Sequence, residues 1–185
     1  LGDSKGRLLD IQQEPDLERG DSGKRLRAMG TFQDVTEIRE AESRMREIAF
    51  FDSVTGLPNR TFFMERLSEM LALARRNDIC MALMFVDLDQ FKRVNDSWGH
   101  HAGDELLCQV STRLQETLRR CDVLGRVEGS RDETLARLGG DEFVVLIPQI
   151  RRPEDTARIA RRLLDEFKQP FIIEGTEIFV SGSIG

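Results

Sequence analysis

Two adjacent acids follow two glycines in the stretch Arg137–Pro148, RLGGDEFVVLIP, and five apolar residues come directly after them. Glycine pairs before a strand-like run are typical of hairpin turns. The pattern therefore predicts a turn with Asp141 and Glu142 at its tip. Neighbouring carboxylates repel each other, so either water must solvate this pair or a cation must neutralise it.

A second apolar stretch, Ile79–Val86, also ends in acids, Asp87 and Asp89. Alternation along a strand places these two carboxylates on one face. If the two apolar strands are neighbours, Asp87 and Asp141 approach each other, and their oxygens suit Mg²⁺ shared with a phosphate. Two such ions can activate a hydroxyl and stabilise a leaving pyrophosphate. Solvated strand ends and ordinary hairpin chemistry are the alternative for both features.

The polar segment after this second strand carries residues suited to a nucleotide. Lys92 is a candidate phosphate contact. Asn95 can donate and accept hydrogen bonds and Asp104 can accept two, a pairing that fits the edge of guanine. A turn at Asn95 and a helix N-terminal acid at Asp104 are the simpler alternatives. His100 and His101 have no metal-ligand partner at helical spacing, which favours loop hydrogen bonds.

Charge and cysteine content exclude several functional classes. A net charge of −6 gives the chain no general attraction to nucleic acid, so a phosphate-rich ligand needs local cations or metal ions. The three cysteines lack a C-x-x-C spacing, which argues against a disulfide framework or a zinc site. No apolar run approaches the roughly 20 residues of a membrane-spanning helix. We therefore expect reduced thiols and no membrane contact from this part of the chain.

The elements that must position these residues form a mixed pattern from Asp52 onward. Apolar residues recur at helical spacing in three segments, with short apolar runs between them. The polar segment 91–103 ends in glycine, which predicts an irregular connection, and a helix is expected over 104–118. Helices interleaved with a mostly antiparallel sheet indicate an α+β fold, a two-layer α/β sandwich.

Residues 1–36 contain two short apolar segments with proline and glycine between them. This pattern predicts two antiparallel strands, which are too few to bury a core alone. Thr36 is a good N-cap for a helix over 37–50, whose apolar residues recur at helical spacing. That helix either links two domains or pairs with a copy of itself.

Four motifs, DSVTGLPNR, FVDLDQFKRVND, GHHAGDELL and RLGGDEF, follow one another in this order between Asp52 and Phe143. Together they resemble the GGDEF family of diguanylate cyclases. The resemblance implies a fold like the palm of class III nucleotidyl cyclases. It also implies condensation of two GTP into cyclic di-GMP and two pyrophosphates, across a homodimer in which each subunit holds one GTP.

The same resemblance implies roles for the acids. Asp87 and Asp141 match the ligands of Mg²⁺, with Mn²⁺ as the alternative ion, and the carbonyl of Leu88 helps them. Asp141 also matches the group that helps to deprotonate the attacking 3′-hydroxyl, and Glu142 assists the metals. Lys92 matches a phosphate contact that stabilises the transition state.

Substrate-binding roles are implied in the same way. Asn95 and Asp104 match the pair that recognises guanine, and His100 lies in the same substrate loop. Gly139 and Gly140 leave room for ribose and phosphate close to the backbone, where a side chain would clash.

An inhibitory product site is implied by Arg119 and Asp122, which match the family's Arg-x-x-Asp, with Arg161 as a second arginine. Sixteen residues separate Asp122 from Gly139, far more than in the family's pattern. We interpret residues 127–137, or a shift of this segment, as an insertion that loops out. A solvated helix end is the alternative for Arg119 and Asp122.

The N-terminal part resembles the end of a PAS sensor domain through GTFQDVTEIREAE, with Asp34–Thr36 as its closing motif. This predicts a PAS fragment over 1–36, a signalling helix over 37–50 and a GGDEF domain over 51–185. The GGDEF domain is expected to be truncated, because the family continues with a strand and a helix that carries a lysine and an arginine for the GTP phosphates.

A second function stays open. The chain can instead be a weak or inactive module that binds GTP or cyclic di-GMP and regulates a downstream EAL phosphodiesterase domain. Under either reading we expect GTP and cyclic di-GMP as ligands, no nucleic-acid partner and a bacterial cytoplasmic location, with a membrane tether in the full-length protein as an open alternative.

Overall fold

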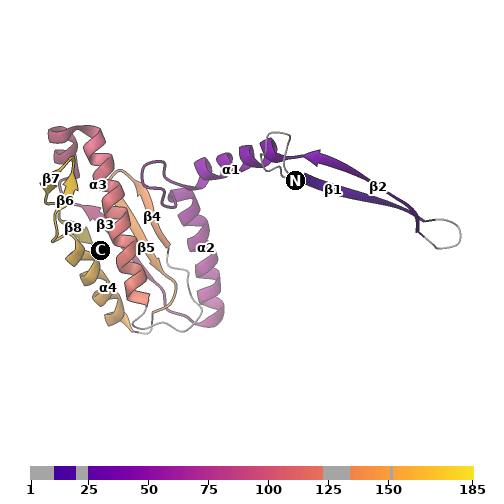
Figure 1. Cartoon of the computed structure of the whole chain (residues 1–185). Helices are drawn as coiled ribbons and strands as arrows, with labels where there is room; N and C mark the ends of the chain where they lie inside the picture. Colours follow the sequence, from indigo (N-terminus) through magenta and orange to yellow (C-terminus); the bar gives the residue numbers. More distant parts are fainter. Residues whose placement is uncertain (1–10, 20–24, 123–133, 151) are drawn as a thin grey trace. The chain divides into compact units, whose positions relative to one another are not determined.

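The computed structural model describes residues 11–19, 25–122, 134–150 and 152–185 (Figure 1). The chain divides into two compact units, residues 1–48 and 49–185. Within the described residues, no helix is both long and apolar enough to cross a membrane.

The first unit begins with the two predicted strands. β1 (Ile11–Arg19) and β2 (Arg25–Asp34) form an antiparallel pair. Helix α1 (Thr36–Phe50) follows, and the carboxylate of Asp34 accepts a hydrogen bond of 3.0 Å from the backbone N–H of Thr36. This bond satisfies one of the amides that a helix leaves without an internal partner at its start. The strand pair and the helix are thus confirmed.

The second unit is built on an antiparallel sheet with the strand order β4-β5-β3-β8 and a separate hairpin, β6-β7 (Figure 1). The predicted alternation of helices and strands, and with it the mixed helix-and-sheet class, is confirmed. The elements are α2 (Arg60–Asn77), β3 (Ala82–Leu88), α3 (Phe91–Asp122), β4 (Thr134–Gly139), β5 (Glu142–Ile147), α4 (Pro153–Glu166), β6 (Phe171–Ile173), β7 (Thr176–Ile178) and β8 (Gly182–Ile184).

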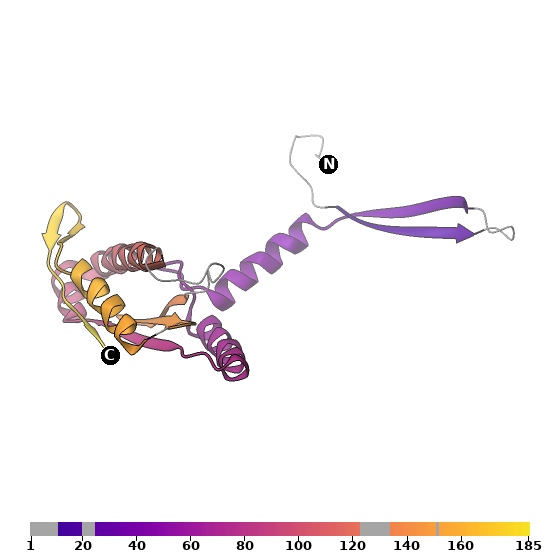
Figure 2. The same cartoon turned by 90° about the horizontal axis from the view of Figure 1, so that it is seen from below.

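Alternation along β5 explains why helices lie on both faces of the sheet. Its odd-numbered side chains, such as Phe143 and Val145, pack in the larger core beneath α3 and α4. Its even-numbered side chains, Val144 and Leu146, pack against α2 through Phe63. Figures 1 and 2 show α3 and α4 on one side of the sheet and α2 on the other. Burial on both faces holds β5, and the turn before it, in a rigid position.

Helix α3 begins at Phe91, so the prediction of an irregular segment over 91–103 is wrong. Phe91 and Val94 are buried one turn apart, which anchors a short first helix. Few apolar residues mark this turn, and the polar side chains around it conceal the helical spacing. The helix bends at Gly99, whose φ of 84° and ψ of 167° are not helical. A residue other than glycine rarely adopts that φ, so Gly99 sets the bend.

The predicted insertion over 127–137 also needs correction. Arg137 and Ala136 belong to β4, where they are paired with Phe143 and Val144 of β5. Ala136 is fully buried against α2, so this end of the segment is part of the fold. The remainder, residues 127–133, lies outside the described residues.

Candidate functional site

The strand β3, which carries Asp87 one residue before its end, lies beside the strand that follows the two glycines. β3 and β5 are antiparallel neighbours, and Asp87 is paired with Glu142 in their register. Asp141 lies in the turn between β4 and β5, one residue before Glu142. The prediction that the two apolar strands are neighbours is confirmed, and this pairing brings Asp87 to the glycine turn.

Asp87 lies in a locally negative environment. Partial burial, followed by repulsion from Asp141, Glu142 and Asp89, raises the pKa of its carboxyl above the ordinary value. The Asp87 side chain is nevertheless exposed, so a cation in solvent can reach it. A cation bound between these carboxylates would replace repulsion by attraction and favour the ionised form of Asp87.

The donors at this point are hard oxygen atoms. Asp87 and Asp141 supply carboxylates, and the backbone carbonyl of Leu88 follows Asp87 directly in the chain. In the described part of the chain, no group of three or more His, Cys, Asp or Glu side chains could hold a metal ion. Two carboxylates and a carbonyl are hard oxygen donors, and such a set fits an ion such as Mg²⁺, which commonly takes its remaining ligands from water and a substrate's phosphates.

Asp89, two residues after Asp87, forms hydrogen bonds with the segment around β8. Its carboxylate accepts hydrogen bonds from the hydroxyls of Ser181 and Ser183, at 2.6 and 2.8 Å, and these bonds lower its pKa. Its backbone N–H also donates to the carbonyl of Ser181 at 2.9 Å. Asp89 thus ties the end of β3 to the residues around β8, while Asp87 stays exposed toward the glycine turn.

The glycine turn offers open space. Gly139 and Gly140 have φ values of 140° and 57°, which residues with side chains rarely adopt. A Cβ atom built on either glycine would meet nothing within 4 Å. A ligand can therefore approach the backbone of this turn without displacing protein atoms, as the predicted role of both glycines requires.

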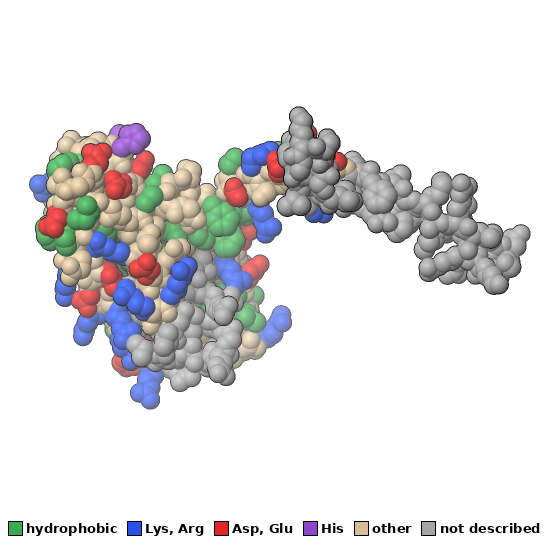
Figure 3. All heavy atoms as spheres, viewed as in Figure 1, with side chains coloured by type: hydrophobic (Ala, Val, Ile, Leu, Met, Phe, Trp, Pro, Cys, Tyr) green, Lys and Arg blue, Asp and Glu red, His purple; other side chains and the backbone are tan. Residues whose placement is uncertain are grey.

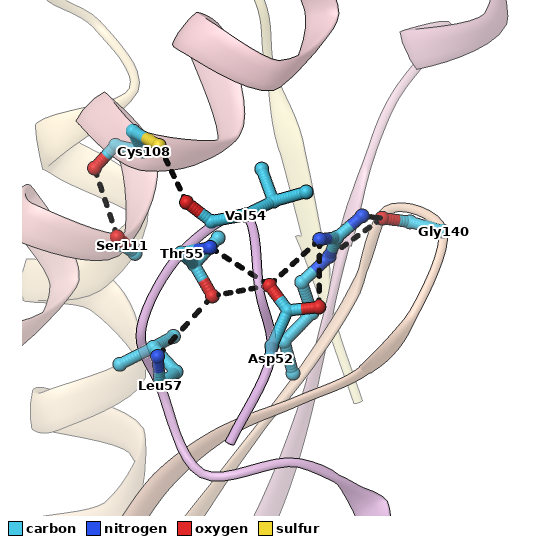
Figure 4. Close-up of polar contacts among 8 residues, drawn as sticks. Asp52, Val54, Thr55, Leu57, Cys108, Ser111 and Gly140 are labelled. Atoms are coloured by element: carbon cyan, nitrogen blue, oxygen red, sulfur yellow. Dashed lines mark hydrogen bonds and ion pairs between the residues drawn. The ribbon is translucent and has the colours of Figure 1, made fainter. Parts of the chain in front are cut away.

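A buried arginine holds the turn in place. The guanidinium of Arg137, whose side chain is only 9% exposed, donates from Nε and Nη2 to the carbonyl of Gly140 at 3.0 and 2.7 Å. Its Nη1 donates to both carboxylate oxygens of Asp52, at 3.0 and 2.9 Å (Figure 4). The guanidinium therefore links the carbonyl of Gly140 in the glycine turn to Asp52.

Asp52 is itself fixed by the turn that it begins. The backbone N–H and the hydroxyl of Thr55 both donate to its carboxylate, at 2.8 and 2.7 Å (Figure 4). Burial raises the pKa of Asp52, but the hydrogen bonds from Thr55 and Arg137 outweigh it and hold the pKa below the ordinary value. The N–H of Arg137 also donates to the carbonyl of Pro58 at 3.0 Å. Residues 52–58 thus hold β4 in place at Arg137, shortly before the glycine turn.

The bend in α3 places Asn95, one of the predicted guanine-binding residues, against Gly103, the residue before Asp104. Asn95 lies before Gly99 and Asp104 lies after it. In a straight helix, residues 95 and 103 would lie about 12 Å apart along the axis. A Cβ built on Gly103 would instead lie 2.0 Å from Oδ1 of Asn95. The half-buried Asn95 amide therefore rests on the residue that directly precedes the exposed Asp104.

Two further predicted site residues are exposed on α3. Lys92 lies in its first turn and His100 directly after the bend at Gly99. The histidine side chains are visible on the surface in Figure 3. Both positions are open to a ligand, and the described contacts do not tie either side chain to the acids.

The predicted inhibitory site is described only in part. Arg119 on α3 and Arg161 on α4 are both exposed, and these helices pack against each other. Figure 3 shows Lys and Arg side chains gathered over α4 and the neighbouring end of α3. One ion pair between the helices joins Arg120 of α3 to Glu166 of α4 at 2.8 Å. The side chain of Asp122 lies outside the described residues.

Four residues of the site had no role assigned from the sequence: Asp52, Asp89, Gly103 and Arg137. The sequence carries a usable signal for Arg137, because an arginine among apolar strand residues needs a partner when it is buried. It carries none for Gly103, because the helix around it was not recognised.

Comparison with protein families gives one match. The family described as "Diguanylate cyclase, GGDEF domain" matches residues 49–131 and 130–185. Among curated proteins, the bifunctional diguanylate cyclase/cyclic di-GMP phosphodiesterase MucR of Pseudomonas aeruginosa is 41% identical over 150 residues, 81% of this chain and 20% of MucR. The diguanylate cyclase TpbB of the same species is 35% identical over 149 residues, 80% of this chain and 32% of TpbB. The chain thus spans between a fifth and a third of these relatives.

Solved structures show the same likeness. The GGDEF domain of TpbB from Pseudomonas aeruginosa superposes with a TM-score of 0.64 and 35% identity, covering 73% of both chains. The coiled coil and GGDEF domain of DgcB from Caulobacter crescentus, in complex with c-di-GMP, superposes with a TM-score of 0.68 and 25% identity, covering 82% of this chain and 75% of that one.

Proposed function

The chain belongs to the GGDEF family of diguanylate cyclases, and we propose that it condenses two GTP molecules into cyclic di-GMP with release of two pyrophosphates. One observation carries the proposal: Asp87 is paired with Glu142 across β3 and β5 at an open, arginine-braced glycine turn. Carboxylates brought together beside empty backbone space suit a cation and a phosphate. Since the chain spans only part of its relatives, the activity of the whole protein is included in this proposal.

In the proposed reaction, Asp87 and Asp141 hold Mg²⁺, or Mn²⁺ in its place, with the carbonyl of Leu88. When bound, the ion supplies positive charge that neutralises the triphosphate and stabilises the leaving pyrophosphate. Glu142 adds negative charge that keeps the ion at the turn. Two observations support this arrangement. Asp87 is exposed, so a cation can reach it, and a bound cation would relieve the repulsion between Asp87 and its neighbouring carboxylates.

Bond formation is assigned to the turn and the start of α3. Asp141 helps to remove the proton from the 3′-hydroxyl of one GTP. That oxygen then bonds to the α-phosphorus of the other GTP, whose bond to the bridging oxygen breaks and releases pyrophosphate. Lys92 contacts the phosphates and stabilises the added negative charge. Each protomer holds one GTP, so the two half-sites of a homodimer face each other.

Recognition of the base is assigned to α3. Asn95 and Asp104 bind the guanine edge, with His100 beside them, while Gly139 and Gly140 leave room for ribose and phosphate. The bend at Gly99 supports this assignment, because it brings the Asn95 amide onto the residue preceding Asp104.

A regulatory role is the second candidate function, and the name of one relative supports it. The relative NbdA of Pseudomonas aeruginosa, 36% identical over 151 residues, is named a cyclic di-GMP phosphodiesterase. In that role the chain binds GTP, or binds cyclic di-GMP at Arg119, Asp122 and Arg161, and controls an EAL domain elsewhere in the full-length protein. Residues 1–36 and the helix over 37–50 would act as the end of a PAS sensor and its signalling helix.

Incubation with GTP and Mg²⁺ at concentrations that favour a dimer tests the two roles. We expect cyclic di-GMP in the chromatogram of the wild-type chain and none with Asp141→Asn. GTP that binds without conversion, lost in the same variant, supports the regulatory role instead. Absence of product, of GTP binding and of cyclic di-GMP binding contradicts both roles.

A further inference from the structure

Gly103 occupies a position in α3 where the backbone does not require glycine. It lies inside the second part of the helix, after the bend, and its φ is not positive. Glycine is among the least favourable residues for a helix interior, because it has the most conformational freedom to lose. A glycine in such a position indicates a packing or functional reason.

The packing around Gly103 identifies that reason. A Cβ on this residue would lie 2.0 Å from Oδ1 and 3.0 Å from Cγ of Asn95. It would also lie 3.2 Å from Cζ of Phe91, a core side chain that is only 9% exposed. Phe91 has little freedom to move, because it packs within the main core. An added methyl group would therefore displace the amide of Asn95.

The place of this contact gives it a functional meaning. The Asn95 amide lies against Gly103, and Gly103 directly precedes Asp104 in the chain. The amide offers a donor and an acceptor, while the carboxylate only accepts. Guanine presents an N–H and an amino group beside its carbonyl oxygen, whereas adenine has no ring N–H on that edge. The relative position of the two side chains thus decides which base is accepted.

We propose that Gly103 is a positioning residue for base selection: the missing side chain lets the Asn95 amide lie beside Asp104, in the position that accepts guanine. The inference rests on the proposed function, because it assumes that Asn95 and Asp104 bind the base. Gly103 acts through Asn95, whose amide lies against it.

A double-mutant cycle tests the proposal with four chains: wild type, Gly103→Ala, Asn95→Ala and the double variant. Affinities for GTP, ITP, which lacks the 2-amino group, and ATP are measured by displacement of a fluorescent GTP analogue. We expect Gly103→Ala to weaken GTP binding about tenfold and to reduce the preference for GTP over ITP and ATP, because a polar contact to the base is lost. Turnover at saturating GTP should change less than binding does.

The double variant separates positioning from general damage. With Asn95 shortened to alanine, a methyl group at residue 103 has room, so the double variant should bind as Asn95→Ala alone does. Helix propensity alone gives no reason for a lower melting temperature in Gly103→Ala, since alanine is a better helix former than glycine. Gly175→Ala, in the turn between β6 and β7, serves as the control: it strains a positive φ and should lower the melting temperature without changing base preference.

Each outcome decides. Wild-type affinity and base preference in Gly103→Ala, or additive losses in the double variant, overturn the inference alone. If Gly103→Ala does not fold but the double variant does, the clash with Asn95 is upheld. If neither variant folds, Phe91 is what excludes a side chain at residue 103, and the inference is overturned. A wild-type chain that binds GTP no better than ATP overturns the proposed function, and the inference with it.

Discussion

The glycine turn and the end of β3 face the same site, but they are held in opposite ways. The turn is braced from behind by the guanidinium of Arg137, which bonds to Gly140 and Asp52. The end of β3 presents Asp87 to other carboxylates that raise its pKa. Bonds within the protein thus preorganise the first region, whereas in the proposed function a cation completes the second.

This contrast predicts that the two regions contribute differently to the stability of the fold. Residues that position the site should be costly to remove, because their loss leaves buried polar groups without partners. Removal of the residues proposed to bind the cation should cost little stability, or even raise it, because their loss relieves repulsion. Stability and activity should therefore respond differently in the two regions.

The largest loss of stability is expected from Arg137→Ala. Removing one member of a buried ion pair typically costs about 3–5 kcal/mol, since the partner is left without compensation. Here the carboxylate of Asp52 keeps its hydrogen bonds from Thr55 but loses the guanidinium, and the carbonyl of Gly140 loses both of its bonds from Arg137, so activity should fall as well. Urea unfolding measures the effect. The matched control, Arg158→Ala, removes an exposed pair with Asp155 and should cost less than about 1 kcal/mol; equal losses in the two variants would argue against the brace.

Asp87→Asn should have the largest effect on turnover and a small effect of the opposite sign on stability. Without metal, the variant should be slightly more stable than the wild type, by less than about 1 kcal/mol, because exposed charges are screened by solvent. Stabilisation by Mg²⁺ with GTP, and the formation of cyclic di-GMP, should both disappear. Thermal melts and chromatography measure these effects, with Glu177→Gln on β7 as the control for loss of an exposed acid. A destabilised metal-free variant would contradict the repulsion.

The acid limb of the stability profile should report Asp52. Its folded pKa is below the ordinary value, so it contributes stability above the unfolded pKa of about 3.9 and loses that contribution as pH falls through the folded value. Asp52→Asn should lower stability at neutral pH and flatten the profile below about pH 4. Chemical unfolding at a series of pH values measures this. An unchanged slope in the variant would exclude Asp52 from the acid transition.

The acids of the site were predictable because their signal is local. An apolar run bordered by a carboxylate is visible in the sequence in both places, because Asp87 directly follows one run and Asp141 shortly precedes another. That the two strands are neighbours is expected in a small mixed sheet. The glycine turn is likewise a local pattern. The matched motifs added roles for Lys92, Asn95 and Asp104, which remain predictions.

The parts that the sequence did not reveal depend on contacts between distant residues. Asp52 and Arg137 are 85 positions apart, and neither position alone indicates the other. The first part of α3 carries few buried residues, so its helical spacing was hidden. The contact of Gly103 with Asn95 exists only because the helix bends at Gly99. Long-range pairing and local bends of this kind are set by the packed fold.

Titration with Mn²⁺ in the presence of GTP, followed by electron paramagnetic resonance, tests most directly whether Asp87 and Asp141 form one cation site. We expect the wild-type chain to bind Mn²⁺, and both Asp87→Asn and Asp141→Asn to bind it at least about tenfold more weakly, as loss of a carboxylate ligand requires. Equal Mn²⁺ affinity in the wild type and the two variants would contradict a shared site at the glycine turn.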